Sequence, residues 1–177
     1  MYFFLNAFSL YLRNAPTFAY KITYKIIYSL LFHVLKMRQK VILTNLRWAF
    51  PNKDKDWYKK TMKLCYKFYT KEFLDFLSFP RNYKHSKIIF LNLEVLLSAL
   101  DKKNGVILIG SHFGSFDKLF YAMNEKNIDL TGVAYKQNNK GADLFFKEIR
   151  EKFIKNQLYK GGNSRLLSES LSQNNVL

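Results

Sequence analysis

The apolar run at residues 106–109 (VILI), which Gly110 follows, constrains the fold of this chain more than any other feature. An apolar run of this length between glycines is typical of a parallel strand that is buried on both faces. Asn92 is a suitable N-cap for a helix that Gly105 ends before the run, and a second helix is expected from about Phe116 to Lys126. The run therefore predicts a buried strand between two helices.

The same alternation continues to the last residue of the chain. We expect further extended segments at residues 86–92, 130–135, 157–159 and 175–177, and helices at residues 143–155 and 164–173. Strands alternating with helices predict the α/β class, here with N-terminal helices followed by a mostly parallel sheet. Because a strand begins at residues 175–177, we expect the domain to be incomplete at its C-terminus and the chain to be truncated.

The N-terminal part of the chain is expected to be helical throughout. A long helix begins at Asp54 or Asp56 and ends before Pro80. Residues 18–35 approach the length of a membrane span, but charged and polar side chains interrupt them and favour a helix lying in the membrane interface. A helix docked on the protein's own core remains the alternative. We therefore divide the chain into a helical membrane-interface segment, 1–36, and an α/β domain, 37–177.

The charge of the chain favours an anionic partner. Lys and Arg number 29 against 13 Asp and Glu, which gives a formal net charge of +16. Nucleic acid, anionic lipid head groups and an acidic carrier protein all fit such a surface. Cys65 is the single cysteine, which excludes an internal disulfide and a thiolate metal cluster. The sequence shows no metal-ligand spacing and no glycine-rich phosphate loop, so no metal is expected.

His112 and Asp117 are the candidate catalytic pair. His112 lies two residues beyond Gly110, where α/β sheets bind ligands. If Gly114 allows a tight turn and Ser115 caps the next helix, Asp117 lies in the first helical turn and stays ionised. Its carboxylate can then fix one imidazole nitrogen and leave the other to take a proton as a general base. A hydrogen-bonded core histidine in an ordinary turn is the structural alternative.

Residues 105–117 (GVILIGSHFGSFD) resemble the H-x4-D/E block of acyltransferases. They resemble in particular the "HFGNWE"-like block of the bacterial lipid A biosynthesis (lauroyl/myristoyl) acyltransferases. Further blocks resemble that family in the same order, at residues 37–52 (MRQKVILTNLRWAFPN), 95–110, 132–153 and 164–177. The resemblance covers most of the chain from residue 37 to residue 177, and it implies that residues 37–177 are a partial acyltransferase domain.

The resemblance implies an activity and its partners. A fatty acyl group would pass from acyl carrier protein to a hydroxyl of a lipid A precursor, at the cytoplasmic face of the bacterial inner membrane. The expected partners are acyl carrier protein, the lipid A precursor and the anionic membrane, without nucleic acid. No bound cofactor is implied, since acyl-ACP or acyl-CoA is a co-substrate.

The resemblance also assigns residues. His112 would be the general base, and Asp117 would orient it. Phe113, Gly114 and Ser115 would contact substrate.

Two basic residues further along the chain complete the expected site. Lys136 falls on the arginine of the family's "YRP" segment and would contact a phosphate with a single charge rather than a bidentate fork. Arg150 would face the anionic head group, or else lie on a solvated helix face. Two other functions remain open: a truncated, inactive relative, and a noncatalytic basic protein that binds membrane or nucleic acid.

Overall fold

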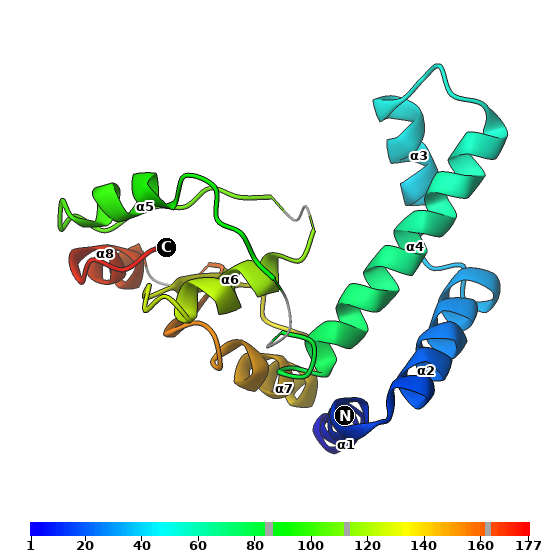
Figure 1. Cartoon of the computed structure of the whole chain (residues 1–177), viewed down its shortest axis with the longest axis horizontal. Helices are drawn as coiled ribbons and strands as arrows, with labels where there is room; N and C mark the ends of the chain where they lie inside the picture. Colours follow the sequence, from blue (N-terminus) through cyan, green and yellow to red (C-terminus); the bar gives the residue numbers. More distant parts are fainter. Residues whose placement is uncertain (84–86, 112–113, 162–163) are drawn as a thin grey trace. The chain divides into compact units, whose positions relative to one another are not determined.

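The computed structural model describes residues 1–83, 87–111, 114–161 and 164–177, shown in Figure 1. The chain divides into two compact units. The helical unit comprises Leu10–Ser78, and the sheet unit comprises Met1–Ser9 with Phe79–Leu177. The described residues confirm the α/β class, with N-terminal helices preceding parallel strands that alternate with helices.

The helical unit contains four helical elements besides the end of α1 (Tyr2–Asn14), in the order α2 (Thr17–Ser29), the π-helical turn η1 (Leu30–Val34), α3 (Gln39–Ala49) and α4 (Lys55–Leu77). The predicted long helix is confirmed as α4. Asp54 is its N-cap, and the Asp54 carboxylate accepts a 2.7 Å hydrogen bond from the backbone N–H of Trp57. None of the described helices is both long and apolar enough to cross a membrane.

One face of α2 packs on α4, which runs beside it in Figure 1. Tyr20 donates a 2.6 Å hydrogen bond to the buried carboxylate of Asp75, which also pairs with Lys71 at 2.6 Å. Beyond α2, Phe32 packs edge-on against Tyr66 at 5.1 Å between ring centroids, in a core that also contains Met62. These polar and aromatic contacts hold α2 and η1 on α4.

The sheet unit is built on parallel pairing. Its regular strands are β1 (Thr131–Ala134) and β2 (Asn156–Tyr159), paired with Thr131 opposite Asn156. On the other side of β1, Val176 forms parallel bridges to both Leu130 and Val106. The order of extended segments across this sheet is therefore residues 106–108, residues 175–177, β1 and β2. This arrangement confirms the prediction that residues 175–177 enter the sheet.

Helices connect these segments: α5 (Leu93–Leu100), α6 (Phe116–Asn124), α7 (Lys140–Arg150) and α8 (Ser164–Ser172). The helix predicted at residues 143–155 begins and ends earlier. Asn139 caps α7 by accepting a 3.0 Å hydrogen bond from Ala142, whereas Phe153 and Ile154 leave the helix to enter the core. The run at residues 86–92 forms no strand over its described residues 87–92.

The predicted burial of residues 106–109 is wrong. Val106 pairs with the buried Val176, but Ile107 is 63% and Ile109 is 92% exposed. Among the described residues, this run has a hydrogen-bonded neighbouring strand on one side only. The bond farthest along the run is donated by the backbone N–H of Leu108 to the carbonyl oxygen of Leu177, at 2.8 Å. The run therefore joins the parallel sheet as predicted, but as an exposed edge rather than as a central strand.

Candidate functional site

The loop between residue 110 and α6 has the conformation that the sequence predicted at its described positions. His112 and Phe113 lie outside the described residues. Gly114 has a φ of +80°, in the left-handed region that glycine adopts readily. Ser115 is the N-cap position of α6, as predicted, but its side chain makes no capping hydrogen bond. Asp117 lies in the first turn of α6, where the helix dipole favours a negative charge.

Asp117 is a buried carboxylate with a tyrosine partner. Its relative exposure is 6%, and its Oδ2 accepts a hydrogen bond from the hydroxyl of Tyr83, which is 1% exposed. Tyr83 comes from the segment after α4, 34 residues before Asp117. A buried charge is tolerated only where hydrogen bonds compensate its lost hydration, so the Tyr83 hydroxyl helps to retain the carboxylate in this position.

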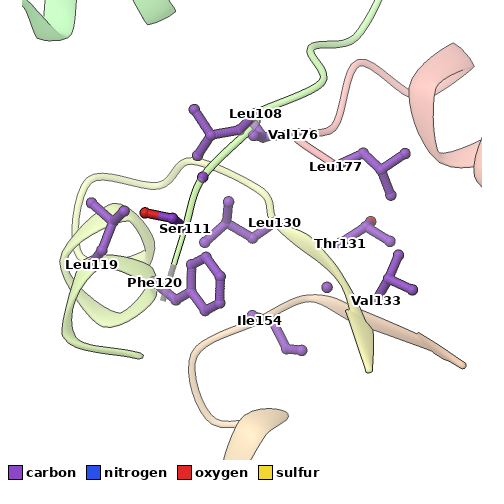
Figure 2. A pocket seen from close by; sticks show the side chains of 12 residues that line it. Leu108, Ser111, Leu119, Phe120, Leu130, Thr131, Val133, Ile154, Val176 and Leu177 are labelled. Atoms are coloured by element: carbon purple, nitrogen blue, oxygen red, sulfur yellow. The ribbon is translucent and has the colours of Figure 1, made fainter. Parts of the chain in front are cut away.

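An apolar cavity of about 370 Å³ lies next to this loop. Figure 2 shows side chains from α6, from β1 and from the last two residues of the chain around it. Leu119, Phe120 and Ile154 contribute to its wall, and Gly110 and Ser111 belong to its lining. Because Ser111 immediately precedes His112, the cavity adjoins the segment that carries the candidate base. Its volume falls within the roughly 300–1,000 Å³ of ligand pockets.

The two predicted basic residues lie near a different carboxylate, that of Asp143 on α7. Asp143 accepts a 2.8 Å hydrogen bond from the backbone N–H of Gln137 and a 2.9 Å bond from the hydroxyl of Tyr159. Chiefly the bond from Gln137, with help from Tyr159 and the charges of Arg150 and Lys136, holds the pKa of Asp143 below its ordinary value. Asp143 thus orders the segment that follows β1.

Arg150 is half-buried at the end of α7 rather than fully solvated. Its Nε donates a 2.5 Å hydrogen bond to the side chain of Gln157 on β2, and burial lowers the pKa of its guanidinium. Its Nη2 is buried and has no hydrogen-bond partner within the described part of the chain. Lys136 is exposed, two residues beyond β1. Both cations therefore lie near Asp143, whereas Asp117 is held by Tyr83.

Comparison with known proteins identifies the family. A model of the bacterial lipid A biosynthesis acyltransferases matches residues 1–177, the whole chain. The chain belongs to this family. No curated protein sequence matched it significantly. Its activity is therefore acyl transfer in lipid A biosynthesis, with a lipid A precursor as the acceptor.

Sequence reasoning missed Tyr83, the residue whose hydroxyl binds the candidate carboxylate Asp117. The contact joins residues far apart in the chain, and no local spacing around Tyr83 in "RNYKHS" indicates a partner on α6. Across the ranges that the structure describes, no group of three His, Cys, Asp or Glu side chains is placed to hold a metal ion.

Proposed function

We propose that this chain transfers a fatty acyl group from acyl carrier protein to a hydroxyl of a lipid A precursor, with His112 as general base and Asp117 as the residue that orients it. The observation that carries this proposal is the position of Asp117. It is a buried carboxylate in the first turn of α6, five residues after His112 and beside a loop whose preceding residues line an apolar cavity.

The reaction is an acyl transfer between two nucleophiles. The acceptor hydroxyl attacks the thioester carbonyl, a C–O bond forms, and the hydroxyl proton passes to the imidazole of His112. The tetrahedral intermediate then collapses, the C–S bond breaks, and the proton on His112 is returned to the leaving thiolate. Asp117 stays ionised throughout and stabilises the imidazolium. The backbone N–H groups at the start of α6 are candidates for holding the oxyanion.

The apolar cavity supports a lipid donor. Its lining consists mostly of aliphatic side chains and one phenyl ring, and no Asp, Glu, Lys or Arg side chain is among the described residues that line it. Such a cavity suits a hydrocarbon chain, whose transfer out of water is favourable by about 0.8 kcal/mol per buried methylene. We therefore assign the acyl chain to this cavity, with its thioester at the end near Ser111.

Lys136 and Arg150 support an anionic acceptor. Lysine supplies an exposed charge after β1, and Arg150 retains a buried N–H that is unpaired within the described residues. Phosphate oxygens of a lipid A precursor are suitable acceptors for both. The net charge of +16 also favours an acidic acyl carrier protein as the donor protein.

Membrane association is proposed through α2, whose two faces differ. Tyr20 and Tyr24 hydrogen-bond to α4, while positions two residues away are turned by about 200° to the opposite side of the helix. On that side lie Phe18, Ile22 and Ile26, and the exposed apolar series continues at the same spacing of four residues into η1 with Leu30 and Val34; these five residues form the α2 stripe. Lys21 and Lys25 flank it, as expected for a helix that lies on an anionic bilayer surface.

Mass spectrometry of lipid A tests the reaction. The chain is expressed in a bacterial strain that lacks its own secondary acyltransferase, alongside His112→Ala, Asp117→Asn and the control Asp129→Asn. Asp129 is an exposed carboxylate that pairs with Lys155 at 2.5 Å, so its loss tests for a general effect of removing an acid.

We expect one added acyl mass with the unsubstituted chain and with Asp129→Asn. His112→Ala should add none and Asp117→Asn far less than the unsubstituted chain, although both accumulate as folded protein. No added acyl mass from the unsubstituted chain, when it is present in the membrane fraction, would overturn the proposal. Unchanged acylation by His112→Ala would leave acyl transfer standing but remove the assigned base.

A further inference from the structure

The contact between Tyr83 and Asp117 brings a second buried side chain to the proposed site. The Tyr83 hydroxyl donates to Oδ2 of Asp117, and both side chains are almost fully buried. We propose that Tyr83 is a positioning residue of this acyltransferase, whose hydroxyl fixes the orientation of the Asp117 carboxylate and, through it, the imidazole of His112. This inference rests on the proposed function, because it assumes that Asp117 orients the base.

The ring of Tyr83 is held on several sides. Phe79 packs edge-on against it at 4.8 Å between ring centroids, and Tyr121 of α6 does the same at 5.6 Å. Phe79 in turn packs against the buried Phe153 at 5.5 Å. The ammonium group of Lys118 lies over the Tyr83 ring, 5.9 Å from its centre. A tyrosine fixed in this way presents its hydroxyl at a constant point.

A fixed hydroxyl restricts the carboxylate that it binds. Rotation of the Asp117 carboxylate about its Cβ–Cγ bond would break the hydrogen bond on Oδ2, at a buried position where the lost bond is costly. A hydrogen bond donated to a carboxylate also favours its ionised form, which is the form that can accept from an imidazole N–H. The hydroxyl of Tyr83 therefore supplies both orientation and charge to the residue that directs His112.

Tyr83 differs from a tyrosine with only a structural role in the group that its hydroxyl binds, the Asp117 carboxylate. The neighbouring Tyr121 has the same ring chemistry in the same cluster, but its hydroxyl interacts with Glu125 at the end of α6. Tyr121→Phe is thus a matched control for Tyr83→Phe. Both substitutions keep the aromatic packing and remove one hydroxyl, but only Tyr83→Phe removes a donor to Asp117.

Steady-state kinetics of the full chain, with acyl-ACP and a lipid A precursor, test the inference. Loss of a hydrogen-bond partner that orients a functional side chain typically changes activity by about 10–100-fold, so we expect Tyr83→Phe to lower kcat by this factor with KM nearly unchanged. Tyr121→Phe should stay within about twofold of the unsubstituted enzyme. In an Asp117→Asn background, Tyr83→Phe should cause no further loss, because a residue that acts through Asp117 has nothing left to orient.

A second measurement does not depend on the folding of Tyr83→Phe. In protein labelled with carbon-13 at tyrosine Cζ, the signal of Tyr83 should move in Asp117→Asn and stay in place in Asp129→Asn. A signal that does not respond to Asp117→Asn would show that the two groups are not in contact, and it would overturn the inference.

The remaining outcomes separate the inference from the proposed function. If Asp117→Asn lowers transfer strongly while Tyr83→Phe is as active as Tyr121→Phe, the positioning role is wrong and the proposed function stands. An additive loss in the double variant leads to the same conclusion. If the unsubstituted chain gives no turnover, or Asp117→Asn is fully active, the proposed function fails and the inference fails with it.

Discussion

The hydroxyl of Tyr159 on β2 donates a 2.9 Å hydrogen bond to the carboxylate of Asp143 on α7. The same carboxylate accepts a 2.8 Å bond from the backbone N–H of Gln137, in the segment between β1 and α7. Asp143 therefore joins three consecutive parts of the sheet unit through one side chain. Because these bonds are made to the ionised form, they tie the stability of this region to pH.

Replacement of Asp143 by asparagine should reduce the acid sensitivity of the fold. The hydrogen bond from Gln137, more than any other cause, holds the folded-state pKa of Asp143 below its ordinary value of 3.8. A depressed carboxyl pKa contributes stability that is present above the unfolded-state pKa and lost as pH falls through the folded-state pKa. We expect Asp143→Asn to be less stable than the unsubstituted chain near pH 6, with a difference that narrows below about pH 4.

Urea denaturation at a series of pH values measures this difference. Tyr159→Phe is the matched variant, because it removes one donor and leaves the bond from Gln137 in place. Its pH dependence should lie between those of the other two proteins. A constant difference between Asp143→Asn and the unsubstituted chain at every pH would contradict the prediction.

Gly114 should resist substitution for a conformational reason. Its φ of +80° disfavours any residue with a Cβ, although an added Cβ would meet no atom within 4 Å. Gly114→Ala should therefore lower the free energy of unfolding by about 1 kcal/mol or more. Gly110→Ala is the control, since Gly110 has equally open space and no left-handed φ. Equal stability of the two variants in urea denaturation would show that the turn does not require glycine.

Local sequence pattern predicted where several extended segments lie in this fold, but it did not predict how deeply each one is buried. Residues 175–177 were expected to begin a strand, and Val176 indeed bridges Val106 and Leu130. The apolar run at residues 106–109 was expected to be buried on both faces, yet Ile109 is 92% exposed. Apolar composition indicates that a segment can be buried. Whether it is buried depends on neighbouring strands and helices, which no short window of sequence contains.

The same distinction applies to the site. The positive φ of Gly114 and the place of Asp117 in the first turn of α6 follow from residues within a few positions of each other. Tyr83 reaches Asp117 only because the segment after α4 folds against α6. The half-buried state of Arg150 likewise depends on Gln157, which β2 places beside the end of α7. Contacts of this kind require the tertiary structure.

Narrowing the apolar cavity should shorten the acyl chain that is transferred. Val133 of β1 lines the cavity and is 53% exposed, so Val133→Trp can be accommodated without overpacking the core. One methylene in an apolar pocket is worth about 1–3 kcal/mol of discrimination. We therefore expect the preference for the best donor over one that is two carbons shorter to fall by about tenfold or more. Competition between acyl-ACP donors of different length measures this preference.

Val95→Trp on α5 controls for the added indole ring. Val95 is 67% exposed and is not part of the cavity lining, so this variant should keep the donor preference of the unsubstituted chain. The same change in preference from both variants would show that the cavity does not hold the acyl chain. A loss of all activity in Val133→Trp with unchanged preference would contradict the assignment as well.

Charged residues in the α2 stripe should weaken membrane binding. Ile22 and Ile26 are 52% and 60% exposed, on the side of α2 opposite the tyrosines that bind α4. Burying an isoleucine side chain is worth about 1.5–3 kcal/mol, so the double variant Ile22→Glu/Ile26→Glu should bind anionic vesicles at least about tenfold more weakly. Sedimentation with phosphatidylglycerol-containing vesicles measures the affinity, and Ile89→Glu is the control, because Ile89 is 69% exposed and lies outside the stripe. If the stripe instead packs on protein, the double variant should lower the free energy of unfolding and leave vesicle binding unchanged, because its apolar side chains would then be part of a core.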